Sequence, residues 1–65
     1  MREPTISEVN AEIRKVKRDM KGNIDTRDGL KFLVPTSKFI AEVEQMIEHQ
    51  KELIKCLETI KEKLL

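Results

Sequence analysis

The sequence predicts an all-α protein in which a short N-terminal helix folds back onto a long, amphipathic C-terminal helix. Apolar residues recur at helical spacing in the first third of the chain and throughout its last half. No glycine or proline follows Pro35, so nothing interrupts the second helix. Charged residues make up 38% of the chain, and tryptophan and tyrosine are absent, a composition typical of long solvated helices. With 65 residues, residues 1–65 are expected to form one small helical domain.

The first predicted helix covers residues 5–20. Thr5 is its candidate N-cap, and Glu8 three residues later completes a capping-box pattern. Gly22, followed by Asn23, is predicted to end the helix in a left-handed backbone conformation. The apolar residues follow an unbroken 3,4,3,4 spacing, which places them in one narrow seam: Ile6, Val9, Ile13, Val16 and Met20.

Residues 22–35 are predicted to be the connector between the helices. The helical spacing stops there, and the segment contains the turn-forming residues Asp25, Asp28 and Gly29. Within it, residues 30–34 form a short apolar run that ends before Pro35, which favours extended backbone in the preceding residue. This run is interpreted either as a short strand or as an ordered loop that lays its apolar side chains onto the helices.

The second predicted helix covers residues 37–65, with Thr36 or Ser37 as its cap. It follows a strict heptad repeat in which the a and d positions are apolar, apart from a single glutamine, and the first three e positions are isoleucine. Position a holds Val43, Gln50, Leu57 and Leu64; position d holds Phe39, Met46, Leu53 and Ile60; and position e holds Ile40, Ile47 and Ile54. These residues form the predicted self-association surface.

A stripe this wide requires neighbours on two sides. The first helix can cover one side. At about 1.5 Å per residue, a helix over residues 37–65 would extend roughly 43 Å, nearly twice the length of the first helix. We therefore expect a second copy to cover the remainder, giving a homodimeric helix bundle or coiled coil, with a tetramer as the alternative. Gln50 either hydrogen bonds to its symmetry mate and fixes the register, or lies at the bundle edge in contact with water.

No enzymatic or cofactor-binding pattern is present in the sequence, and we expect neither activity nor cofactor. Cys56 is the single cysteine, so it has no partner for an intrachain disulfide. His49 precedes it by seven residues, which places both at g positions about 10 Å apart on one helix. That distance is too long for a shared metal or a nucleophile and base pair within one chain.

The one local excess of positive charge lies in the first helix, although the net charge of the chain is only +1. We call this cluster the basic arc, and all of its members except Lys15 share one face of the helix beside the apolar seam: Arg14, Lys15, Lys17, Arg18 and Lys21. Cations at such spacing contact nucleic-acid phosphates in some proteins, but they also favour the C-terminal end of a helix as an ordinary solvated face. Both interpretations remain open.

The function predicted from these patterns is that of a small homo-oligomeric module acting through protein–protein interaction, as an adaptor, a scaffold or an inhibitor-type regulator of an unidentified protein partner. The alternative is a small dimeric nucleic-acid-binding regulator that uses the basic arc. A third hypothesis, donation of the second helix to a groove of a larger protein, is not separable from the first. No apolar run approaches the roughly 20 residues of a membrane span, so we expect no membrane partner and a cytoplasmic or nuclear location.

Overall fold

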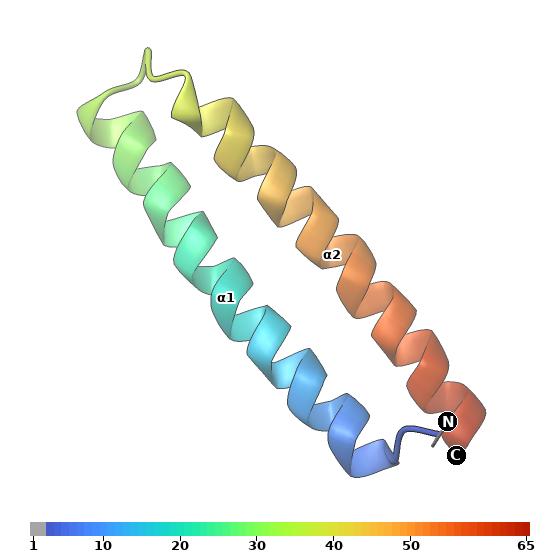
Figure 1. The fold of residues 1–65 in the computed structure, drawn as a ribbon. Coiled ribbons are helices and arrows are strands. Elements are labelled where there is room, and N and C mark those ends of the chain that lie inside the picture. The colour runs from blue at the N-terminus through green and yellow to red at the C-terminus, as the bar shows by residue number, and fades with distance from the viewer. Residues whose placement is uncertain (1–2) are drawn as a thin grey trace.

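The computed structural model describes residues 3–65, which form two antiparallel helices, α1 (Ile6–Leu33) and α2 (Phe39–Leu64), joined by residues 34–38 (Figure 1). The helices pack along their length, and the molecule measures 45 × 19 × 14 Å. The start of α1 and the end of α2 lie at the same end, which we call the open end; the connection forms the opposite end, which we call the tip (Figure 1). Residues 3–65 contain no strand, which confirms the all-α helical hairpin.

The start of α1 matches the sequence-based prediction. Thr5 has extended backbone angles (φ −87°, ψ 161°), and its Oγ1 accepts a hydrogen bond from the Glu8 backbone N–H at 3.1 Å. The Thr5 hydroxyl in turn donates to Glu8 Oε1 at 3.2 Å. A side-chain cap of this kind satisfies a backbone donor that the first turn leaves unpaired, and typically stabilises a helix by about 1 kcal/mol.

The predicted end of the first helix at Met20 is wrong. α1 continues through Gly22 and Gly29 to Leu33, and neither glycine adopts a positive φ. Both therefore lie in ordinary helical conformation rather than in a left-handed C-cap. A glycine costs a helix interior about 1 kcal/mol relative to alanine, and packing of the whole helix against α2 offsets that cost.

The continuation of α1 follows the same heptad as its first half. After Met20, the next residues in the 3,4,3 spacing are Asn23, Arg27 and Leu30, and all three are partly buried. Asn23 and Arg27 are polar, so the face of α1 that contacts α2 extends beyond the point where the apolar spacing ends. The connector predicted over residues 22–35 is therefore mostly helix.

The structure also corrects two predictions that followed from assigning residues 22–35 to a connector. The apolar run at residues 30–34 is neither a strand nor a loop folded onto the helices: most of it is helical, and Phe32 is exposed. The helices have similar lengths, 28 and 26 residues. Helix length alone therefore provides no reason for a second chain.

The turn is a compact segment, and α1 ends at Leu33, two residues before Pro35. Val34 leaves the helical region (φ −140°, ψ 68°), and its N–H donates to the Leu30 carbonyl at 2.7 Å. The Ser37 N–H donates to the Val34 carbonyl at 2.9 Å. α2 then begins at Phe39 rather than at residue 37; Lys38 occupies the N-cap, while Ser37 Oγ accepts from the Phe39 N–H at 3.2 Å.

The core is a single seam between the two helices. α1 contributes three buried residues from its N-terminal half, and α2 contributes two isoleucines from its e positions. The buried residues are Val9, Ile13, Val16, Ile47 and Ile54. On α2 the seam consists of the a and e rows, which are buried or partly buried throughout. The prediction that the first helix covers one side of the α2 stripe is confirmed.

Candidate functional site

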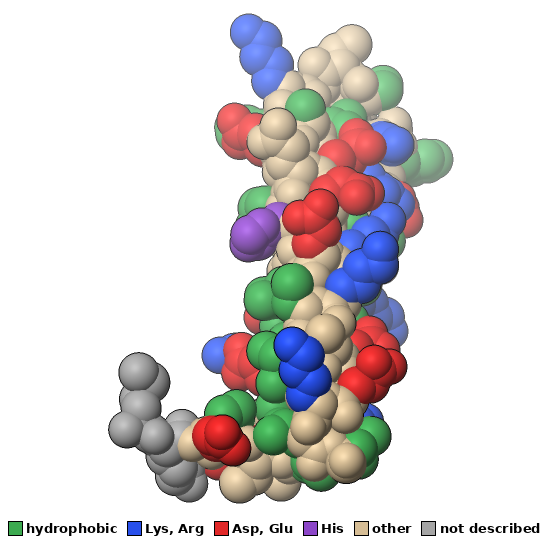
Figure 2. All heavy atoms as spheres, turned by 90° about the vertical axis from the view of Figure 1, so that its right-hand side faces the viewer, with side chains coloured by type: hydrophobic (Ala, Val, Ile, Leu, Met, Phe, Trp, Pro, Cys, Tyr) green, Lys and Arg blue, Asp and Glu red, His purple; other side chains and the backbone are tan. Residues whose placement is uncertain are grey.

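The d positions of α2 form a row of large apolar side chains that α1 does not cover. We call this set the exposed row: Phe39, Met46, Leu53 and Ile60. Their exposed fractions range from 39% to 64%. Because the d and e positions lie on opposite sides of position a, packing of the e row against α1 leaves the d row facing solvent. Figure 2 shows hydrophobic side chains in patches on the α2 side of the molecule, with acidic and basic groups interspersed.

The g positions border the exposed row on its other side. A shallow hollow around Met46 is lined by Glu42, Gln45, His49 and Gln50. Cys56, one heptad after His49, is an exposed free thiol. Within residues 3–65 no group of three or more His, Cys, Asp or Glu side chains is arranged to hold a metal ion. Nor does either helix in that range combine the length and hydropathy of a membrane span.

The polar residue in the α2 seam has a partner within its own chain. Asn23 Nδ2 donates to Gln50 Oε1 at 3.0 Å, and the two side chains are partly buried. The sequence suggested a symmetry mate or water as the partner of Gln50; within the hairpin, its Oε1 accepts a hydrogen bond from Asn23 of the same chain. Sequence reasoning missed Asn23 because it assigned this residue to a connector. A polar pair in an apolar seam fixes helix register, since sliding one helix would leave both groups unpaired.

The Asn23–Gln50 pair is expected to behave as a coupled unit. Asn23→Leu or Gln50→Leu alone should each destabilise the protein by about 1 kcal/mol, because each leaves a partly buried polar group without its partner. The double replacement should cost less than the sum of the two, with a coupling of about 1 kcal/mol. Urea unfolding of the four proteins at one concentration measures this. Additivity of the two single effects would show that the pair does not form.

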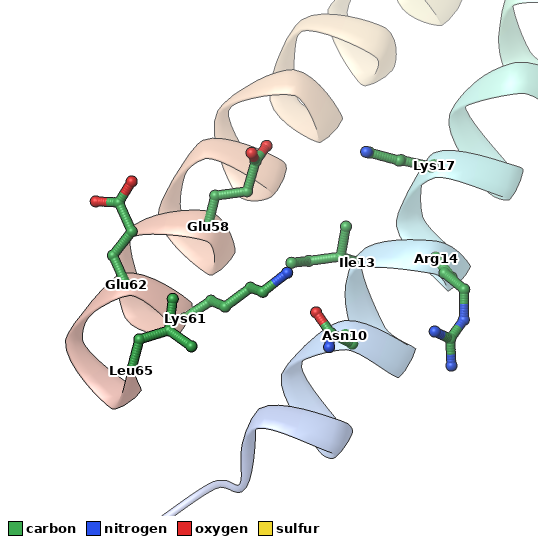
Figure 3. Close-up of a pocket in the computed structure, with 8 residues that line it drawn as sticks. All are labelled: Asn10, Ile13, Arg14, Lys17, Glu58, Lys61, Glu62 and Leu65. Carbon is green, nitrogen blue, oxygen red and sulfur yellow. The ribbon is translucent and has the colours of Figure 1, made fainter.

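The basic arc borders a groove near the open end (Figure 3). The α2 residues of this groove occupy b, e and f positions, so it lies on the opposite side of the hairpin from the exposed row. The groove is lined by Asn10, Ile13, Arg14 and Lys17 of α1 and by Glu58, Lys61, Glu62 and Leu65 of α2. Two members of the arc thus share a concave surface with two carboxylates. The α2 wall also carries Lys61, so three cations and two carboxylates line the groove, and its net positive charge is small.

The other members of the basic arc are exposed on α1: Lys15, Arg18 and Lys21. Arg27, which lies further along the same helix, contacts Asp28 through its Nε at 3.2 Å. Four cations of the arc, Arg14, Lys17, Arg18 and Lys21, are spaced at i, i+3, i+4 and i+7 and so share one face of α1.

No family model matches the chain, and neither a curated protein nor a solved structure matches it.

Proposed function

We propose that this protein is a self-associating helix-bundle module that acts through protein–protein interaction, as an adaptor, a scaffold or an inhibitor-type regulator. The surface through which copies associate is the exposed row on α2. The observation that supports this is the regular spacing of four large apolar side chains along a helix face that the hairpin leaves open. Isolated exposed apolar residues are common on proteins, whereas a continuous row at heptad spacing is typical of a helix–helix contact.

The small size of the core supports the same proposal. Five residues of residues 3–65 are buried apolar side chains, and a chain of 65 residues buries only about 60% of the surface that it exposes when unfolded. Such small scaffolds usually need disulfides, metals or partner chains for stability. Pairing through the exposed row would complete a second apolar seam beside the first and give a four-helix bundle.

The competing function, nucleic-acid binding through the basic arc, has weaker support. Glu58 and Glu62 line the groove that Arg14, Lys17 and Lys61 also line, and the two carboxylates would offset the attraction of these cations for phosphate groups. Donation of α2 alone to a larger protein is also less favoured, because the a and e rows of α2 already pack against α1.

The mass in solution tests the proposal directly. We expect light scattering after size exclusion, at several protein concentrations and at two salt strengths, to give twice the chain mass of 7.6 kDa, with a tetramer as the alternative. Because the contact is mainly apolar, the mass should change little between the two salt strengths. A folded monomer at every concentration would overturn the proposal.

A further inference from the structure

We propose that two copies pair through the exposed row with their α2 helices antiparallel, around a twofold axis that crosses α2 midway between Met46 and Leu53. This inference rests on the proposed function and specifies the occupant of the same surface as a second copy in one defined orientation. Phe39 of one copy then lies beside Ile60 of the partner copy, and Met46 lies beside the partner's Leu53.

The exposed row is complementary to itself. Its four residues are spaced seven apart, so the row has the same spacing when it is read in either direction. A second copy can therefore cover all four residues of the first while burying its own four, as a twofold interface requires. This holds for parallel and antiparallel pairing alike, so the charges around the row determine which one forms.

The g positions beside the row carry opposite charges at their two ends. Glu42 borders the row near the tip, and Lys63 borders it near the open end. Parallel pairing would place Glu42 at the same level as the partner's Glu42, diagonally across the row, and Lys63 at the same level as the partner's Lys63. Antiparallel pairing separates these like charges and brings each Glu42 to within six residues, about 9 Å along the helix, of the partner's Lys63. Like charges that flank a helix contact disfavour one orientation, and opposite charges favour the other.

The two halves of α2 show the same asymmetry. Residues 39–50 contain three glutamates and no lysine or arginine, whereas residues 51–64 contain four lysines and three glutamates, so the net charges are −3 and 4 − 3 = +1. An antiparallel pair sets each acidic half against a weakly basic half. It also opposes the two helix dipoles, which favours antiparallel neighbours.

The tip of the hairpin carries an excess of positive charge. Between Asp28 and Glu42 it has two lysines, Lys31 and Lys38, and no acidic residue. Because tip and open end lie at opposite ends of the rod (Figure 1), antiparallel pairing keeps the two tips apart, whereas parallel pairing would bring the two lysine-bearing tips together.

Cys56 reports on the orientation because it borders the exposed row away from the proposed axis. In an antiparallel pair it lies about 15–20 Å along the helix from the partner's Cys56, whereas a disulfide requires Cα atoms within about 7 Å. It does lie within about one turn of the partner's Met46. In a parallel pair the two Cys56 residues would lie at the same level, diagonally across the exposed row.

The experiment is oxidation of three proteins with oxidised glutathione, with the mass of each measured first under reducing conditions. Wild type should form no disulfide-linked dimer. Met46→Cys, which retains Cys56, should form a linked dimer whose tryptic digest joins the peptide of residues 39–51 to that of residues 56–61. His49→Cys/Cys56→Ser carries its thiol next to the proposed axis, on the same side of the exposed row as the partner's thiol, and should cross-link in the antiparallel pair, which makes it the matched positive control.

Three other outcomes would each overturn a different part of the proposal. A Cys56–Cys56 disulfide in a wild-type protein of dimeric mass would overturn the antiparallel orientation but leave self-association intact. A dimeric mass without cross-linking of the His49→Cys/Cys56→Ser control would show that the exposed row is not an antiparallel contact surface. A monomeric mass under reducing conditions would overturn the proposed function itself.

Discussion

Replacing Ile47 by aspartate is expected to unfold the protein. Ile47 is 2% exposed and is the largest fully buried side chain of residues 3–65. The substitution removes a buried apolar group and places a carboxylate in the seam without a cationic partner, at a cost of about 5 kcal/mol. A 65-residue domain has a total stability of only about 3 to 10 kcal/mol. Circular dichroism at 222 nm should show most of the helical signal lost at 25 °C.

The control for this substitution is Ile47→Val, which keeps the seam apolar and removes one methylene group. It should cost about 1 kcal/mol and leave the helical signal unchanged. Retention of full helicity by Ile47→Asp would mean that α2 does not present its e row to α1, and the assignment of the intramolecular seam to the a and e rows would then be wrong.

Replacing Leu53 by aspartate is expected to abolish self-association. Leu53 lies in the exposed row and is 39% exposed in the hairpin, so the carboxylate can remain in water in the monomer. In the associated state it would be desolvated, once in each copy. We expect this to weaken association by about 3 kcal/mol or more, which is over a hundredfold in Kd. Light scattering at concentrations where wild type is associated should then give the monomer mass.

Ala41→Asp is the matched control because it adds the same charge to α2 at an exposed f position on the outer face. Its mass should equal that of wild type. An unchanged mass for Leu53→Asp would place the contact surface elsewhere on the molecule. Loss of association in both variants would indicate that the added charge, rather than its position, is responsible.

Local signals in the sequence were sufficient to predict the parts of the fold that depend on neighbouring residues. The Thr5 cap and the apolar seam from Val9 to Val16 were predicted because both follow from spacing within a few turns. The all-α hairpin follows from the same two patterns. The residues of α1 whose role is only to contact α2 show no such local spacing pattern.

The continuation of α1 could not be predicted because Gly22 has the same sequence context as a helix C-cap and as a tolerated glycine inside a helix. What distinguishes the two is the contact that Asn23 makes with Gln50, on the other helix. A hydrogen bond between residues 27 positions apart is not visible in the local pattern. The polar seam residues were therefore read as a connector.

The sequence also does not determine which rows of the α2 apolar stripe pack against α1 and which remain exposed. Position a lies between d and e on the helix surface, so α1 can pack against a and d or against a and e with similar apolar burial. Both choices give a regular heptad. Which row remains exposed therefore became clear only from the structure, where Ile47 is buried and Met46 is not.

The uneven distribution of buried residues along α1 has a consequence for the order of folding. The three buried side chains of α1 lie in its N-terminal half, away from the turn. Nearer the turn, the seam includes the polar Asn23 and Arg27, so helix pairing that starts at the turn gains little apolar burial at first. The chain must close a loop of 27 residues before the Asn23–Gln50 hydrogen bond can form, and a longer one before Val16 packs. The entropy cost of closing these loops therefore arises before most of the free energy of apolar burial is gained. We expect the hairpin to fold more slowly than its two-helix topology suggests.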